Sequence, residues 1–94
     1  MLIIAHHNIS DPEGFWATAE NVTKNLPGNL RVIGVYPSQD AKTGTCLWEA
    51  ENVQEVQLFL DQNAGQFAEN FCYEVNVEKS IGLPSTQLAE ASLI

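Results

Sequence analysis

Apolar residues follow strand-like patterns in four segments of this chain and helix-like patterns in two. The strand-like segments are short apolar or alternating runs at 2–7, 30–36, 44–50 and 71–77. In the two segments at 10–26 and 51–61, apolar residues recur every three or four positions, as they do along one face of a helix. The predicted order is therefore strand, helix, strand, strand, helix, strand.

Local signals mark the ends of the first predicted helix. Ser10 and Glu13 fit a capping box, Asp11 is an alternative cap, and Pro12 is tolerated in a first helical turn. The Pro-Gly pair at 27–28 predicts that the helix ends there.

The second predicted helix begins with an Asn52 cap, supported by Glu55, and ends near Asp61. The mixed residues at 63–70 read as a loop, with one further helical turn as an alternative around 66–69.

The strands at 30–36 and 44–50 are symmetric about a polar turn, which predicts an antiparallel hairpin. Alternation along these strands places Tyr36, Cys46 and Trp48 together on one face. The predicted cross-strand pairs are Arg31–Glu49, Val32–Trp48, Ile33–Leu47 and Gly34–Cys46. We interpret Arg31 and Glu49 as a structural pair near a sheet edge.

Both faces of this hairpin are largely apolar, but the two predicted helices can cover only one face of the sheet. The element order predicts an α+β fold, a ferredoxin-like βαββαβ sandwich with a four-stranded antiparallel sheet and both helices on one side. The other side would be bare. We therefore expect a homodimer in which two sheets cover each other.

The predicted domain spans 1–80, and 81–94 form a C-terminal tail. Two alternatives remain open for this tail: it is disordered, or it packs on the partner subunit. Ser85 to Ala91 could form a short capped helix. The apolar residues that would contact a partner are Ile81, Leu83, Leu88, Leu93 and Ile94.

The charge and cysteine content narrow the classes of partner. A formal net charge of −8 with scattered basic residues disfavours nucleic acids and anionic membrane surfaces. Two cysteines, no leader-like start and no long apolar run predict a reduced, cytoplasmic protein.

Tyr36-Pro37-Ser38, then Cys46 to Ala50 and an acidic amphipathic helix, resemble small uncharacterised bacterial proteins of the dimeric α+β barrel superfamily. The resemblance covers roughly 1–83 and implies paired ferredoxin-like subunits. One branch of these proteins is associated with nickel binding. Other superfamily members are small monooxygenases, lactone isomerases and haem-degrading enzymes, so the resemblance implies a fold rather than a reaction.

His6 and His7 are the first candidates for chemistry, as catalytic base or acid or as metal ligands. Adjacent strand residues point to opposite faces, so both cannot bind one ion, although each subunit of a dimer could supply one ligand. The alternative interpretation is that one histidine lies in solvent at the strand end and the other is a hydrogen-bonded wall residue.

Tyr36, Cys46, Trp48 and Tyr73 are the candidate ligand-binding residues, in a pocket between sheet and helices. Core or interface packing is the alternative interpretation of these side chains.

Three functional hypotheses follow. The first is small-molecule binding, extending to a small monooxygenase- or isomerase-like enzyme. The second is nickel or zinc binding by His6 and His7 with Glu49 or Glu74, although no metal-ligand motif is present. The third is a structural or regulatory dimer without chemistry.

Overall fold

The four strands form one antiparallel sheet in the order β2-β3-β1-β4. The structure is a computed structural model and describes residues 1–84. Its elements are β1 (Leu2–Ile9), α1 (Pro12–Thr23), β2 (Arg31–Pro37), β3 (Thr43–Glu49), α2 (Val53–Ala64), β4 (Ala68–Glu74) and a 3₁₀ turn, η1 (Val77–Lys79). No helix in this part of the chain is long and apolar enough to span a bilayer.

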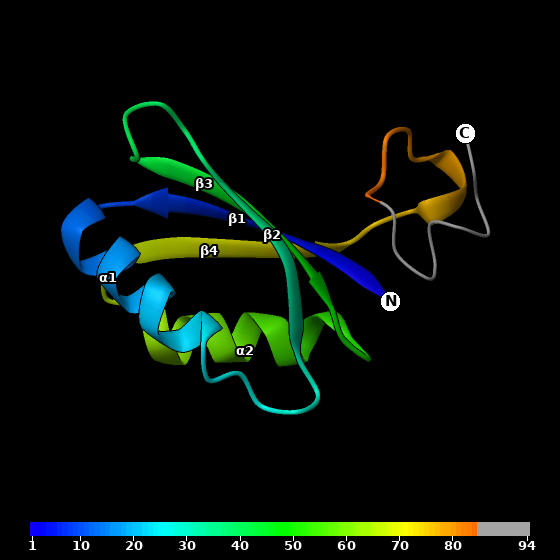
Figure 1. The fold of residues 1–94 in the computed structure, drawn as a ribbon, viewed down its shortest axis with the longest axis horizontal. Helices are drawn as coiled ribbons and strands as arrows, with labels where there is room; N and C mark the ends of the chain where they lie inside the picture. The colour runs from blue at the N-terminus through cyan, green and yellow to red at the C-terminus, as the bar shows by residue number, and fades with distance from the viewer. Residues whose placement is uncertain (85–94) are drawn as a thin grey trace.

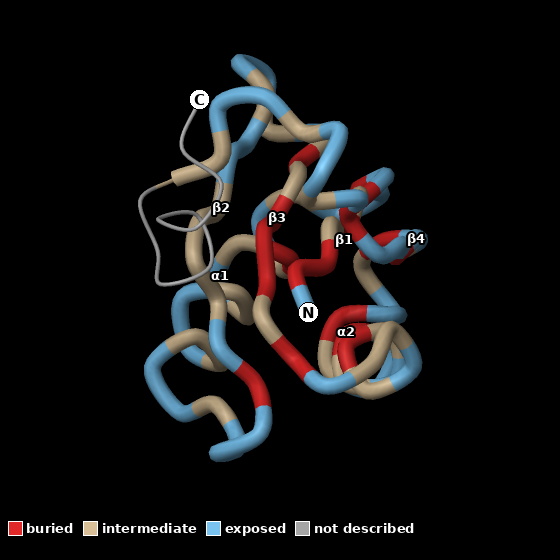
Figure 2. Tube along the Cα trace, turned by 90° about the vertical axis from the view of Figure 1, so that its right-hand side faces the viewer, coloured by how far each residue is buried: buried red, intermediate tan, exposed pale blue. Residues whose placement is uncertain are grey.

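The predicted α+β fold is confirmed, since the element order and the sheet agree with a ferredoxin-like arrangement. Both helices lie on the same side of the sheet (Figure 1). Burial is concentrated in the two central strands, β1 and β3, and on the side of α2 that faces them (Figure 2). The sheet thus has one helix-covered face and one open face.

The helix α1 begins at Pro12 with the alternative cap, Asp11; the predicted Ser10 cap was wrong, because the Ser10 hydroxyl donates to the Phe67 oxygen instead, and the helix ends earlier than predicted. Asp11 is the N-cap, and its Oδ1 accepts a hydrogen bond of 3.1 Å from the Gly14 N–H. The helix ends at Thr23 because its last turn tightens, with the Lys24 and Asn25 N–H groups bonding three residues back.

The second half of the chain departs from its prediction at both α2 and β4. The Asn52 cap is confirmed, with Oδ1 accepting from the Glu55 N–H at 2.9 Å, but α2 continues to Ala64. The predicted loop at 63–70 was wrong in its last part, because β4 already pairs with β1 at Ala68. β4 ends at Glu74, which pairs with Ile3, and the Val75 N–H makes one further bond, to the Leu2 oxygen at 2.9 Å.

The hairpin register agrees with its prediction at two pairs and then shifts by one residue. Arg31–Glu49 and Val32–Trp48 pair as predicted, while Gly34 pairs with Leu47. The pairs beyond are Val35–Cys46, Tyr36–Thr45 and Pro37–Gly44. Ile33 is the extra residue of a β-bulge, and one inserted residue reverses the facing of everything after it. The predicted common face of Tyr36 with Cys46 and Trp48 was therefore wrong.

Two clusters fill the space between sheet and helices. The larger one joins the central strands to α2 and contains Ile3, Ala5, Leu30, Cys46, Trp48, Ala50, Val56, Leu60 and Cys72. The smaller one joins α1 to the ends of α2 and β4 and contains Ile9, Phe15, Ala64 and Ala68. Because Phe15 is the only buried residue of α1, this helix is held less deeply than α2.

The open face is bare only in part. Leu2, Leu47 and Val75 are buried at one end of it, where Val77 and Leu83 pack against them. The other end exposes three aromatic side chains, Tyr36 at 57%, Phe71 at 64% and Tyr73 at 45%. Segment 75–83 thus covers one end of the face.

The segment that was predicted as a tail is described only as far as residue 84. Within it Ile81 is exposed and Leu83 packs on the sheet. The predicted helix from Ser85 to Ala91, and the partner contacts of Leu88, Leu93 and Ile94, lie outside the described residues.

Candidate functional site

The two neighbouring histidines of β1 point to opposite faces of the sheet, as strand geometry predicts. His6 lies on the open face, partly exposed, with Nδ1 3.5 Å from the Thr45 Oγ1. His7 lies on the helix side with no exposed surface. Only His7 is therefore placed beside the helices and the core.

Both ring nitrogens of His7 have a partner. Nδ1 is 2.7 Å from Oδ1 of Asn70 on β4, and Nε2 is 3.1 Å from Sγ of Cys46 on β3. Burial lowers the pKa of His7 below 6.5, although the Asn70 hydrogen bond partly opposes this effect. The imidazole is thus neutral at pH 7 and has one proton to donate.

Polar side chains of α2 hold Asn70 in place from the other side. The Asn70 Nδ2 donates to the Asp61 Oδ1 at 3.3 Å, and the Gln57 Nε2 donates to the Asn70 backbone oxygen at 2.8 Å. A hydrogen-bonded path therefore runs from the exposed Asp61 to the buried thiol of Cys46.

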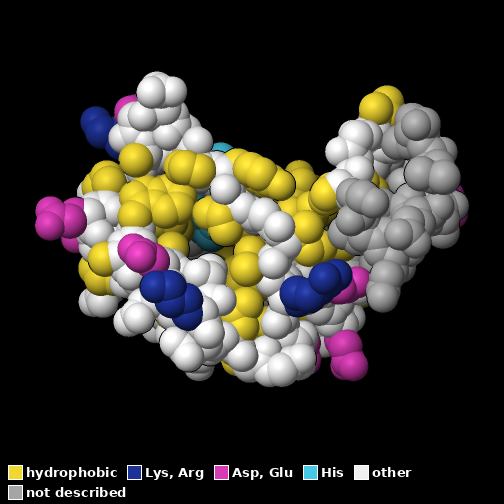
Figure 3. Space-filling view, viewed as in Figure 1, with side chains coloured by type: hydrophobic (Ala, Val, Ile, Leu, Met, Phe, Trp, Pro, Cys, Tyr) yellow, Lys and Arg dark blue, Asp and Glu magenta, His cyan; other side chains and the backbone are white. Residues whose placement is uncertain are grey.

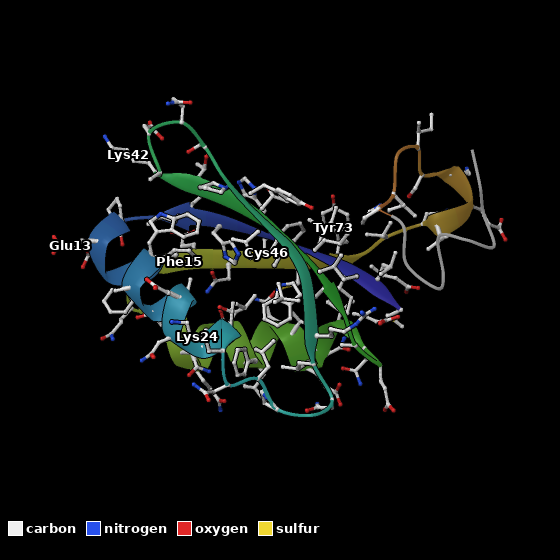
Figure 4. The ribbon with its side chains drawn as sticks, in the orientation of Figure 1. Glu13, Phe15, Lys24, Lys42, Cys46 and Tyr73 are labelled. Atoms are coloured by element: carbon white, nitrogen blue, oxygen red, sulfur yellow. The ribbon has the colours of Figure 1, made fainter. Side chains whose placement is uncertain are left out.

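An apolar hollow adjoins His7 and Cys46. It has a volume of about 30 Å³ and is lined by residues of β1, α1, β2, β3 and α2. These residues are His7, Phe15, Trp16, Ala19, Val22, Thr23, Val35, Cys46, Trp48, Leu60 and Ala64. A cyan imidazole is visible in a recess between yellow side chains (Figure 3). Phe15 and Cys46 lie between α1 and the sheet, whereas Glu13, Lys24 and Lys42 lie at the periphery (Figure 4). The described lining contains no Lys, Arg, Asp or Glu.

The two cysteines are free and buried, and both are held as neutral thiols. Desolvation raises the pKa of Cys46 to about 12 and that of Cys72 to about 11. Their strands lie on either side of β1, and both pair with Ala5. Two such residues are about 10 Å apart, too far for a disulfide without backbone movement. Cys46 is thus a weak hydrogen-bond donor to His7 rather than a ready nucleophile.

The structure divides the predicted pocket residues into two groups. Cys46 and Trp48 line the hollow on the helix side, together with His7. Tyr36 and Tyr73 lie on the open face, where Tyr73 pairs with Ile4 and points away from the helices (Figure 4). The four predicted residues therefore do not form one pocket.

Sequence reasoning missed three residues of this site, Asn70, Phe15 and Trp16. Asn70 was assigned to a loop. Extending the following strand back by one residue would have placed Asn70 on the sheet face opposite to that of Phe71. Phe15 and Trp16 belong to the apolar face predicted for the helix within 10–26, but no sequence signal placed Phe15 5.0 Å from the His7 ring.

The residues predicted as metal ligands are not brought together. Within residues 1–84, no group of three or more His, Cys, Asp or Glu side chains is close enough to hold a metal ion. His6 and His7 lie on opposite faces, and Glu49 is engaged by Arg31, whose Nε donates at 3.0 Å. A nickel or zinc site formed by residues 1–84 of one chain does not fit this geometry.

No family model, no curated protein and no solved structure matches this chain. We therefore infer a function from the geometry of the hollow and of the open face.

Proposed function

We propose that this protein binds a small, largely apolar molecule in the hollow between α1, β2 and the central strands. The observation that supports it is a fully buried, neutral His7 on the wall of an otherwise apolar hollow. Apolar pockets with one or two polar groups are typical of small-molecule sites, where apolar contacts provide affinity and the polar group fixes orientation.

The present hollow has a volume of about 30 Å³, room for about one or two water molecules. A larger molecule therefore requires α1 to move outward. This helix has one buried residue, Phe15, and one side-chain bond to the β2–β3 turn, from Trp16 Nε1 to Ala41 O at 2.9 Å. Few interactions would have to break for the hollow to widen.

The test is a ligand titration of the native protein and of variants that fill the hollow or leave it unchanged. Toluene and phenol are titrated into the native protein and followed by thermal shift and by amide chemical shifts. Ala19→Phe, which places a ring in the hollow, should abolish binding. Ala17→Phe, at an exposed position of the same helix, should retain it. The proposal is wrong if the native protein binds neither probe. It is also wrong if the Ala19→Phe variant binds the probes as tightly as the native protein does.

Enzymatic activity of the monooxygenase or isomerase type stays a prediction of the family resemblance. The neutral pair of His7 and Cys46 offers one acceptor nitrogen and one weak donor, which is enough to orient a ligand. A cytoplasmic location also stays a prediction, with which two free cysteines are compatible.

A specific observation favours homodimerisation as a second part of the proposal. Tyr36, Phe71 and Tyr73 are exposed beside the partly buried Ile4 and Ile33 on one sheet face. Exposed aromatic side chains on one sheet face are typical of protein interfaces, and a second copy would present the same face in return. Two sheets packed in this way would form the dimeric α+β barrel.

Sedimentation velocity at micromolar concentration tests the dimer. Phe71→Lys should shift the protein toward the monomer by placing a charge within the interface. Leu58→Lys is the matched control, because Leu58 is similarly exposed at 59% but lies on α2. A native protein that sediments as a monomer would contradict the dimer, as would equal effects of the two variants.

The form of metal binding that remains is a site shared between the two chains of a dimer, in which each chain would contribute His6 from its open face. The hypothesis of a dimer without chemistry is separated from ligand binding by the titration above.

A further inference from the structure

The proton positions around His7 follow from a backbone group whose donor role is fixed. The Cys72 N–H can only donate, and it donates to the Gln57 Oε1 at 3.0 Å. The amide nitrogen of Gln57 must then face the other way, where it donates to the Asp61 Oδ2 at 3.1 Å and to the Asn70 backbone oxygen. The carboxylate of Asp61 is thereby set as an acceptor.

The acceptor role of Asp61 decides the orientation of the Asn70 amide and the proton position on His7. Since the Asp61 carboxylate accepts, Asn70 turns its Nδ2 toward Asp61 and its Oδ1 toward His7. The His7 Nδ1 must therefore carry the proton of the neutral ring, and Nε2 keeps a lone pair. That lone pair is directed at Cys46, whose thiol is only a weak donor.

Trp48, which also lines the hollow, carries a polar group that lacks a partner. Trp48 is 2% exposed, and its buried Nε1–H has no hydrogen-bond partner among the described residues. Buried donors are nearly always satisfied in folded proteins, and leaving one unsatisfied costs about 1–3 kcal/mol. The hollow is unfilled space that Trp48 borders, so a molecule bound there could supply the missing acceptor.

The two groups together define what the hollow can recognise. His7 Nε2 can accept a hydrogen bond and Trp48 Nε1 can donate one, and the remaining lining is apolar apart from the Cys46 thiol and Thr23. An anion finds no cation in the lining, and a cation finds no carboxylate there, so either would be desolvated without compensation.

We propose that the ligand of this hollow carries a neutral hydroxyl group on an apolar body, with the hydroxyl between His7 and Trp48. The hydroxyl donates to His7 Nε2, replacing the weaker thiol donor, and accepts from Trp48 Nε1. This inference rests on the proposed function, because it assigns the chemical class of the molecule bound at that site.

Four probes with one ring and different polar groups test the inference in the native full-length protein: phenol, toluene, benzoate and benzylamine. Isothermal titration gives each Kd. Phenol should bind about tenfold more tightly than toluene, the ratio expected for one added net hydrogen bond. Benzoate and benzylamine should bind more weakly than toluene. The Trp48 indole N–H resonance should move with phenol more than with toluene.

Two variants separate hydroxyl recognition from ring packing. Trp48→Phe removes the N–H donor and keeps an aromatic ring, so the preference for phenol should fall severalfold. Tyr73→Phe is the matched control, because it also removes a hydrogen-bonding group from an aromatic side chain, but Tyr73 lies on the open face and does not line the hollow. That variant should keep the preference. The indole resonance of the native protein gives the same answer if Trp48→Phe does not fold.

Each outcome supports or overturns one of the two proposals. Equal affinities for phenol and toluene overturn hydroxyl recognition and leave ligand binding intact. Tightest binding of benzoate or benzylamine also overturns it. Failure of both phenol and toluene to bind overturns the proposed function, and this inference with it.

Discussion

His7 and Asn70 face each other as a register pair between β1 and β4, and their side chains share a hydrogen bond of 2.7 Å. The bond fixes which nitrogen of a buried, neutral imidazole carries the proton. It also connects α2, through Asp61 and Gln57, to the central strand. Stability and recognition at the hollow therefore depend on the same pair.

Removing the Asn70 side chain should destabilise the protein. Asn70→Ala leaves the buried His7 Nδ1–H without an acceptor, at a cost of about 1–3 kcal/mol in the free energy of unfolding. Urea denaturation followed by fluorescence measures it. Glu69→Ala, at the exposed neighbouring position, should stay within about 0.5 kcal/mol of native. Equal effects of the two variants would show that the His7 contact contributes nothing.

Stability should decline as pH falls from 7 toward 5. The pKa of His7 is below 6.5 in the folded protein and returns to its ordinary value on unfolding, so the unfolded chain binds more protons in this window. The free energy of unfolding then falls by up to about 1.4 kcal/mol per pH unit between 6.5 and the folded pKa, and this contribution is constant above about pH 7.5.

Urea midpoints measured at several pH values test that slope. His7→Gln should flatten it, while His6→Gln should leave it in place. A direct NMR titration of the His7 ring in the native protein should give a midpoint below 6.5. A midpoint above 6.5 would reverse the predicted sign.

Trp16→Phe should loosen α1 without unfolding the sheet. The variant loses the hydrogen bond from Nε1 to the Ala41 oxygen, worth about 0.5–1.5 kcal/mol, and keeps the aromatic contact with Phe15. Hydrogen exchange should speed up in α1 more than in α2. Lys42→Ala, next to Ala41 but exposed, is the control. Uniform acceleration over both helices would argue against a separately movable α1.

Leu83→Ala should destabilise the protein by about 1–2 kcal/mol, because Leu83 is partly buried against the cluster of Leu2, Leu47 and Val75. Ile81→Ala is a matched control two residues away, with 88% of Ile81 exposed, and should change stability little. Thermal unfolding followed by circular dichroism compares them. If Ile81→Ala costs as much as Leu83→Ala, the segment packs differently in solution.

Sequence patterns predicted the elements more reliably than the site. The caps at Asp11 and Asn52 are local signals, because a side chain bonds an N–H three residues ahead, and both were recognisable. The start of β4 was not, because β4 begins at Ala68 through its pairing with Ile9 of β1, a contact between residues far apart in the sequence. The site depended on this start, because Asn70 reaches His7 only if β4 begins before it.

The α+β class, the order of elements and the opposite facing of His6 and His7 could be read from the sequence, because they follow from periodicity and from bonds between near neighbours. The bulge at Ile33, which moved Tyr36 to the open face away from Trp48, became known only from the folded chain. The same holds for the contacts of His7, whose partners are 39 and 63 residues away. Contacts over such separations depend on register and strand order, and one inserted residue changes which side chains meet.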